Sequence, residues 1–261
     1  MALYDLPALN DALRGTLLHG HLHYFPVIDS TNAAALAAAQ AGAPSGSVFF
    51  AEQQTAGRGR GGHTWHSPAG AGLYASVLLR PTLAPTAALK ISLATGLAAQ
   101  AAIATASGLA ADIRWPNDLM LDGRKVGGIL VETAALGDGA RLRHVVIGVG
   151  INVNHDAFPE ELRHVATSLR IEAGSPQSAQ ALLAALLRNI ALEVAELEAD
   201  GEILERFAAA SSWVRGKRVH VDDGGGYTGY TNGLDANGFL RVRLESGTER
   251  LVLSGGVREI I

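Results

Sequence analysis

The sequence predicts an α+β protein with a larger domain of helices and strands at 1–213 and a small all-β domain at 214–261. Alanine-rich segments behind N-capping residues indicate helices in the first part, and apolar runs rich in β-branched residues indicate buried strands. After Trp213 the alanine content falls, and short strand-like segments alternate with polar, glycine-containing turns. Short strands joined by tight turns are typical of a small β-barrel.

Three longer helices and one shorter one are expected in the first part. Ser30-Thr31-Asn32 provides N-caps for an alanine-rich run that ends near Gly42. Ser175-Pro176 predicts the start of another long helix, which runs to about Ala199, because serine caps a helix and proline suits its first turn. The remaining helices are expected at 85–107 and after residue 201.

Apolar runs predict the strands, and one pair of them forms a hairpin. Asp122-Gly123 is a strong hairpin turn that brings Asn117 and Lys125 close together. The expected strands or extended segments are 48–52, 73–80, 113–115, 119–121, 125–132 and 144–153.

Composition excludes several classes of function. Hydrophobic residues make up 48% of the 261 residues, which allows a sizeable core, and the net charge of −4 argues against a broad nucleic-acid-binding surface. The chain has no cysteine and therefore no disulfide, thiolate metal site or cysteine nucleophile. The apolar helix at 85–107 contains Lys90 and several polar residues, so a buried helix is favoured over a membrane span. We expect a cytoplasmic protein without a signal peptide.

The segment from Gly57 to Trp65 holds two arginines and four glycines within its first six residues. Guanidinium groups bind carboxylate or phosphate oxygens in pairs, and glycine lets the backbone approach an anion. An anion-binding loop and a solvated surface loop are both open at this point. A dinucleotide fingerprint is disfavoured, because the residues after Gly62 predict a loop where that motif needs a helix.

A second segment, Arg114-Trp115-Pro116-Asn117-Asp118, is followed by Lys125 at the start of an apolar strand that contains Gly127 and Gly128. A lysine in this position needs a partner or solvent for its charge. A surface lysine with its stem along the sheet is one explanation. Paired glycines in a strand favour the other, in which a ligand approaches the backbone closely.

These segments together resemble the signature motifs of biotin protein ligases. The glycine–arginine loop, the Arg114–Asp118 segment with its lysine strand, Ser30-Thr31-Asn32 and Gly148-Val149-Gly150-Ile151-Asn152 occur in the order of that family. The resemblance is to the short form without an N-terminal DNA-binding domain. It implies a mixed β-sheet flanked by helices, similar to the catalytic core of class II aminoacyl-tRNA synthetases, with a C-terminal barrel of the Src-homology-3 type.

The resemblance also implies a function. Biotin would react with ATP, accompanied by Mg²⁺, to give biotinyl-5'-AMP, and biotin would then pass to a lysine of a biotin carboxyl carrier protein. A lipoyl protein ligase, a non-catalytic biotin sensor and, least favoured, a nicotinamide oxidoreductase are the alternatives. No nucleic acid or membrane partner is expected, and a homodimer is left open.

Residue roles follow from matching positions in the family motifs. The expected catalytic residues are Arg58, Arg60 and Lys125. The expected biotin-binding residues are Ser30, Thr31, Asn32, Gln54, Gly57, Arg58, Lys125, Gly127 and Gly128. The expected ATP- or adenylate-binding residues are Arg60, Trp65, Asn117, Asp118 and Asn152, with no certain protein ligand for Mg²⁺. His63 stands where the family usually has a third loop arginine, which predicts weaker contacts with ATP phosphates.

Overall fold

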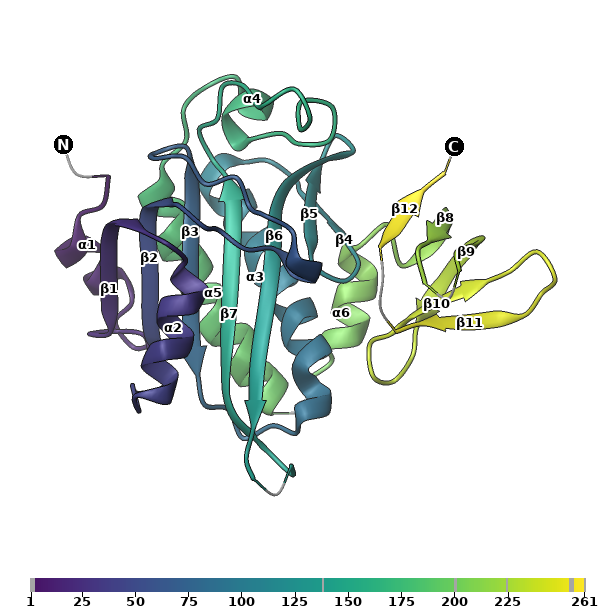
Figure 1. Cartoon of the computed structure of the whole chain (residues 1–261), viewed down its shortest axis with the longest axis horizontal. Coiled ribbons are helices and arrows are strands. Elements are labelled where there is room, and N and C mark those ends of the chain that lie inside the picture. The colour runs from purple at the N-terminus through teal and green to yellow at the C-terminus, as the bar shows by residue number, and fades with distance from the viewer. Residues whose placement is uncertain (1–2, 138, 200, 224, 254–255, 261) are drawn as a thin grey trace.

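The large sheet has seven strands in the order β1-β2-β3-β7-β6-β5-β4 (Figure 1). The computed structural model describes residues 3–137, 139–199, 201–223, 225–253 and 256–260. Strand β1 pairs with β2 in parallel, and every other neighbouring pair is antiparallel. The strands are β1 (Leu22–Ile28), β2 (Ser47–Gln54), β3 (Gly72–Leu79), β4 (Asp112–Arg114), β5 (Asp118–Leu121), β6 (Arg124–Ala135) and β7 (Leu142–Asn152).

Helices cover both faces of this sheet. Successive side chains of a strand point to opposite faces. Phe49 of β2 therefore packs in the smaller cluster with residues of α2 (Thr31–Gln40), while Phe50 packs in the main core. The main core also contains apolar residues of α3 (Ala88–Ser107) and α5 (Ala179–Glu198). The sheet is thus buried between α2 and the α3–α5 pair.

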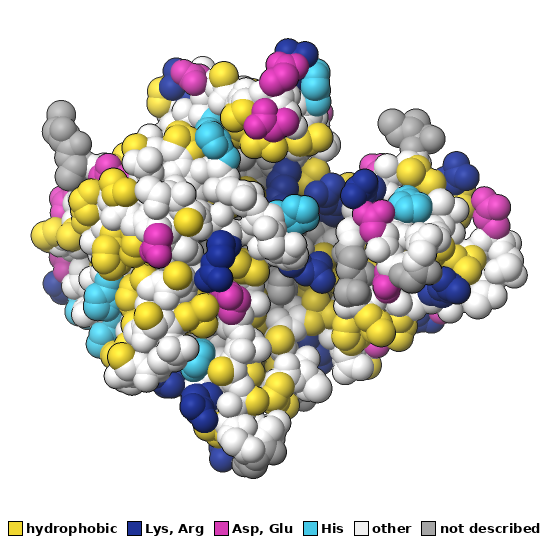
Figure 2. Space-filling view, viewed as in Figure 1, with side chains coloured by type: hydrophobic (Ala, Val, Ile, Leu, Met, Phe, Trp, Pro, Cys, Tyr) yellow, Lys and Arg dark blue, Asp and Glu magenta, His cyan; other side chains and the backbone are white. Residues whose placement is uncertain are grey.

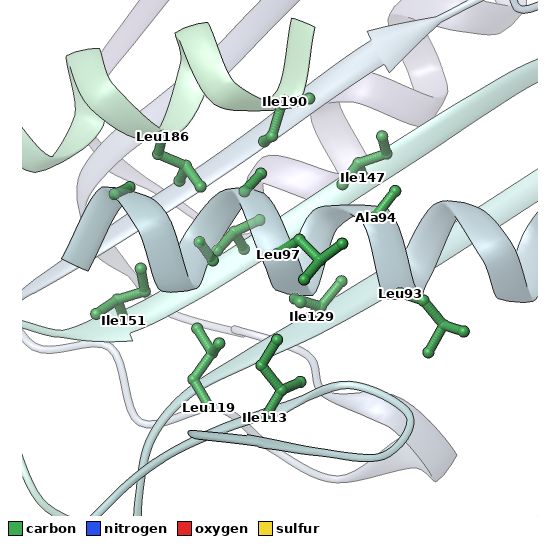
Figure 3. Packing of buried hydrophobic residues seen from close by; sticks show 14 of the residues in the cluster. Leu93, Ala94, Leu97, Ile113, Leu119, Ile129, Ile147, Ile151, Leu186 and Ile190 are labelled. Atoms are coloured by element: carbon green, nitrogen blue, oxygen red, sulfur yellow. The ribbon is translucent and has the colours of Figure 1, made fainter. Parts of the chain in front are cut away.

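Helix α3 lies in the interior of the protein. Figure 3 shows Ala94 of α3 beside Ile147 and Leu97 of α3 beside Ile129, with the α5 residues Leu186 and Ile190 in the same cluster. Together with the preceding turn η2 (Pro85–Ala87), this helix is long and apolar enough to cross a membrane by length and composition. Most of it is buried against the sheet and α5. The prediction of a buried helix at this position is confirmed.

A second, antiparallel sheet of five strands follows in the order β11-β10-β9-β8-β12. Its strands are β8 (Arg215–Val221), β9 (Tyr227–Leu234), β10 (Leu240–Arg243), β11 (Glu249–Val252) and β12 (Val257–Glu259), and α6 (Ile203–Ala210) precedes them. The Trp115 indole donates to the Gly238 carbonyl at 2.9 Å and so joins the two sheets. The predicted α+β class with an all-β C-terminal part is confirmed.

The start predicted at Ser175-Pro176 for the helix that runs to about Ala199 is wrong by several residues. Helix α5 begins at Ala179, and the Ser178 side chain caps it by accepting from the Ala181 amide. Gln177 is held outside the helix, because its amide donates to Asn154 Oδ1 at 2.8 Å and its carbonyl accepts from Asn154 Nδ2 at 2.9 Å. Two short helices, α1 (Leu6–Ala12) and α4 (Leu169–Ala173), were not predicted.

Candidate functional site

One pocket, of about 450 Å³, collects residues from all four sequence motifs. It lies over strands β6 and β7, beside the start of α2 and beneath the glycine–arginine loop. Figure 2 shows Lys and Arg side chains gathered where the part of the protein that contains the seven-stranded sheet meets the C-terminal sheet. The sequence-predicted residues that line the pocket are Ser30, Thr31, Asn32, Gln54, Arg58, Arg60, Trp65, Asn117, Lys125 and Gly128.

Glycines form the floor of this pocket. A Cβ atom on Gly148 would lie 2.1 Å from Asn32 Oδ1, and one on Gly150 would lie 2.6 Å from the Trp65 indole nitrogen. A Cβ atom on Gly128 would be 3.3 Å from Lys125 Nζ. The absence of a side chain at these three positions of β6 and β7 therefore makes room for the polar groups above them.

A hydrogen-bonded network of polar side chains fills one end of the pocket. The backbone amide and hydroxyl of Thr31 both donate to Gln54 Oε1, at 2.9 and 3.1 Å. Ser76 Oγ lies 2.8 Å from the Thr31 hydroxyl and 2.5 Å from Asn32 Oδ1. The side-chain amide nitrogen of Asn32, Nδ2, donates to Glu132 Oε2 at 2.8 Å. Donors and acceptors are thus fixed side by side, which suits a small ligand with both.

Ser30 supports this network as the N-cap of α2. Its side chain accepts from the Ala33 amide as the N-cap of α2, which confirms the predicted capping role. Ser30, Thr31 and Asn32 are all buried. The helix therefore begins with its first residues turned toward the pocket.

The glycine–arginine loop folds back on itself over the pocket. The Gly59 amide donates to the His63 carbonyl at 2.7 Å, and the Trp65 amide donates to the Gly57 carbonyl at 2.9 Å. A single short turn, η1 (Arg60–Gly62), interrupts the loop, with Gly61 and Gly62 at positive φ. No dinucleotide-type helix follows, so the oxidoreductase alternative loses its structural basis.

Cationic side chains from two distant segments meet in this pocket. Arg58 lies 3.6 Å from the Glu132 carboxylate and is about half exposed. Lys125 Nζ lies 2.5 Å from Asp118 Oδ1 and 5.5 Å from the centre of a Trp65 ring. The lysine is partly buried and faces the pocket, so the explanation of a free surface lysine is wrong.

The Trp65 indole is positioned between the loop and the pocket floor. Its nitrogen is buried and has no hydrogen-bond partner among the residues that the structure describes. The ring lies against Gly150 and near Lys125. A polar ligand that entered here would meet an available donor.

Four predicted site residues do not line the pocket. Gly57 begins the loop and faces Ser67, since a Cβ atom on it would be 2.6 Å from Ser67 Oγ, and Gly127 packs against Leu119. Asp118 pairs with Lys125 behind the pocket wall. Asn152 is buried and donates to the Thr167 carbonyl at 3.0 Å, so it fixes the segment after β7. Each of these residues supports the lining instead of forming it.

The sequence interpretation missed two members of the network, Ser76 and Glu132. Ser76 is fully buried in the otherwise apolar strand β3. A buried polar residue needs a hydrogen-bonding partner, and this was the available signal. Glu132 ends the Lys125 motif and had no assigned role. No cluster of three or more metal-binding side chains occurs within the described ranges.

The α+β fold thus presents a polar, glycine-floored pocket with two loop arginines and a strand lysine, an arrangement suited to a small anionic ligand. The chain belongs to the biotin/lipoate A/B protein ligase family, whose model matches residues 24–152. It is 36% identical to the bifunctional ligase/repressor BirA of Escherichia coli over 87% of this chain and 70% of that one. It is 35% identical to the biotin–[acetyl-CoA-carboxylase] ligase of Mycobacterium tuberculosis over 87% of this chain and 84% of that one.

Other relatives are matched over a smaller part. BirA of Bacillus subtilis is 42% identical, and the alignment covers 62% of this chain and half of that one. Among solved structures, the biotin protein ligase of Aquifex aeolicus in complex with biotin and ATP has a TM-score of 0.79 and 28% identity. That match covers 92% of this chain and all of the other. The predicted family is confirmed.

Proposed function

We propose that this protein is an ATP-dependent biotin protein ligase. It activates biotin as biotinyl-5'-AMP and transfers biotin to a lysine of a biotin carboxyl carrier protein. The observation that carries the proposal is that Arg58 and Lys125 line the same pocket as the polar network of Thr31, Asn32 and Gln54. The names of two relatives, the Mycobacterium tuberculosis ligase and the Aquifex aeolicus ligase, favour biotin over lipoate.

In the first step the biotin carboxylate attacks the α-phosphorus of ATP, and pyrophosphate leaves. Both reactants are anions, so cations must hold them together. Arg58 binds the carboxylate and Arg60 binds the ATP phosphates, while Lys125 stabilises the charge that develops on the reacting oxygens. Positioning and electrostatics supply most of the acceleration, and no protein nucleophile is required.

In the second step the amine of the carrier lysine attacks the acyl carbon of the adenylate and releases AMP. Ser30, Thr31, Asn32 and Gln54 hold the ureido ring, which has both donors and acceptors. Gly128 lets the backbone of the pocket floor approach biotin, and Gly57 and Gly127 support the lining behind it. The part of the pocket that binds the nucleotide is lined by Trp65 and Asn117 and supported by Asp118 and Asn152.

Mg²⁺ arrives bound to the ATP phosphates in this proposal. The Asp118 carboxylate is already paired with Arg114 and Lys125, so we assign it no metal. The carrier is that of acetyl-CoA carboxylase or a related carboxylase. We also propose a cytoplasmic location and a domain boundary between residues 213 and 214.

Incorporation of labelled biotin into a purified carrier domain, with and without ATP, tests the proposal. We expect transfer only with ATP, and a loss of about 100-fold or more in Arg58→Met and Lys125→Met, because each removes a charge from the reacting centre. Arg143→Met is the matched control, since Arg143 is an exposed arginine of β7. Biotin binding without transfer supports a sensor instead, and transfer of lipoate alone supports a lipoyl ligase.

A further inference from the structure

Arg114 lies outside the pocket but is connected to its lysine through one carboxylate. Arg114 Nη2 lies 2.5 Å from Asp118 Oδ2, and Lys125 Nζ lies 2.5 Å from Asp118 Oδ1. The side chain of Asp118 is largely buried, and those of Arg114 and Lys125 are about a quarter to a third exposed. A single carboxylate therefore bridges two cations, one of which faces the pocket.

Trp213 holds the other side of Arg114. The guanidinium carbon lies 5.5 Å from the centre of the indole ring, within the range of a cation–π contact. Trp213 is 7% exposed and stands in the link between α6 and β8. Ser211 Oγ donates to the Ile113 carbonyl and Ser212 Oγ to Asp112 Oδ2, each at 2.5 Å, so the link is tied to β4.

The charges of this chain of contacts determine how strongly Lys125 attracts an anion. Arg114, Asp118 and Lys125 together carry one net positive charge. Without Arg114 the carboxylate would neutralise Lys125 alone, and both Asp118 oxygens would be free to turn toward it. Arg114 therefore weakens the ion pair between Asp118 and Lys125 by sharing the carboxylate. Trp213 in turn restricts the movement of Arg114.

We propose that Arg114 and Trp213 are positioning residues for Lys125. The segment that precedes β8 thereby determines the position of the pocket lysine and the net charge of the Arg114–Asp118–Lys125 cluster. The effect on rate rests on the proposed ligase function. The effect on geometry does not, and it can be measured separately.

The chain offers a matched control on the same ring. Lys217 Nζ lies 5.4 Å from the Trp213 ring centre and pairs with Glu259 of β12 at 2.8 Å. It has no contact with Asp118 among the contacts of the described residues. Lys217→Met thus removes a cation from Trp213 without touching the Arg114–Asp118–Lys125 chain.

Biotin-dependent ATP–pyrophosphate exchange measures the first step in the full-length protein. We expect Arg114→Met to lower kcat about tenfold or more and Trp213→Leu to lower it about threefold to tenfold, as for the loss of a charge partner and of a cation–π contact. The biotin KM should stay within about threefold, because the polar network is untouched. Arg114→Lys and Trp213→Phe should recover most of the loss, and Lys217→Met should match the wild type.

Crystal structures of wild type, Arg114→Met and Trp213→Leu provide the second measurement. We expect Asp118 and Lys125 to change position in both variants. Unchanged Asp118 and Lys125 positions would overturn the proposal, as would wild-type kcat in Arg114→Met or an equal loss in Lys217→Met. If the wild type shows no exchange, the ligase proposal fails while the structures still decide the positioning. If Trp213→Leu does not fold, Arg114→Met decides alone.

Discussion

The side-chain amide of Asn32 donates to the Glu132 carboxylate at 2.8 Å, although the two residues are 100 positions apart in the sequence. This bond fixes the orientation of the Asn32 side chain, because its amide nitrogen faces Glu132 and its oxygen lies 2.5 Å from Ser76 Oγ. The same carboxylate lies 3.6 Å from Arg58. The polar end and the cationic loop of the pocket are therefore joined through one glutamate of β6.

Ser76→Ala should weaken both the fold and ligand binding. The substitution removes the hydrogen-bond partner of two buried groups, on Thr31 and Asn32, and should cost about 1–3 kcal/mol of stability. Thermal unfolding and calorimetric titration with biotin measure the two effects. Ser246→Ala, in an exposed turn, is the control. Undiminished biotin affinity in Ser76→Ala would contradict the assigned role of the network.

Gly150→Ala should displace Trp65 from the pocket floor. The added methyl group would lie 2.6 Å from the indole nitrogen, which is closer than atoms can approach, so the ring must move. We expect a change in tryptophan fluorescence and a loss of about tenfold in adenylate formation, since a small misplacement at a reacting centre is costly. Gly137→Ala is the control, because nothing lies within 4 Å of its Cβ position. An unchanged emission spectrum in Gly150→Ala would count against this placement of Trp65.

His63→Arg should lower the KM for ATP. His63 is an exposed residue of the glycine–arginine loop, and an arginine there adds a permanent charge with paired donors for phosphate. We expect a decrease of about threefold to tenfold, as for one added charge-assisted contact. Steady-state kinetics at saturating biotin measure the change. His19→Arg places the same charge on an exposed residue far from the loop, and the prediction fails if both variants behave alike.

Acid should destabilise the protein through His155. Burial, reinforced by the nearby His66, lowers the pKa of His155 to about 4, while Asp156 opposes the shift. The ring stacks on Phe158 at 4.7 Å. An unfolded histidine titrates near pH 6.5, so between about pH 6.5 and 4 the unfolded chain binds more protons and stability falls as the pH falls. Burial lowers the pKa of His144 as well, and its contribution has the same sign.

The substitution His155→Phe tests this assignment by comparing melting temperatures at pH 7 and pH 5. The melting temperature of the variant should fall less between pH 7 and pH 5 than that of the wild type. The reason is that His155, one of the buried histidines, is no longer present to titrate. His164→Phe, an exposed residue of the same segment, should leave the difference as it is. If the melting temperature of His155→Phe depended on pH as in the wild type, groups other than His155 would cause the acid sensitivity.

Local sequence determined most of the elements and the chemical character of the site. Ser30 caps α2, and the arginine-rich loop lacks a following long helix, as its residues predict. The apolar runs form strands, since alternation and β-branched residues act within a few residues of each other. The start of α5 was one exception, because a distant residue, Asn154, holds Gln177 outside the helix.

The sequence by itself determined which cations and polar groups this protein carries, and in which loops, caps and strands they stand. Only the tertiary structure decided their partners. Ser76 and Glu132 meet Asn32 because β3, β6 and α2 pack together, and Trp213 meets Arg114 because the link between α6 and β8 lies on β4. Such contacts join residues far apart in the chain, and they depend on strand order and packing, which local periodicity does not encode.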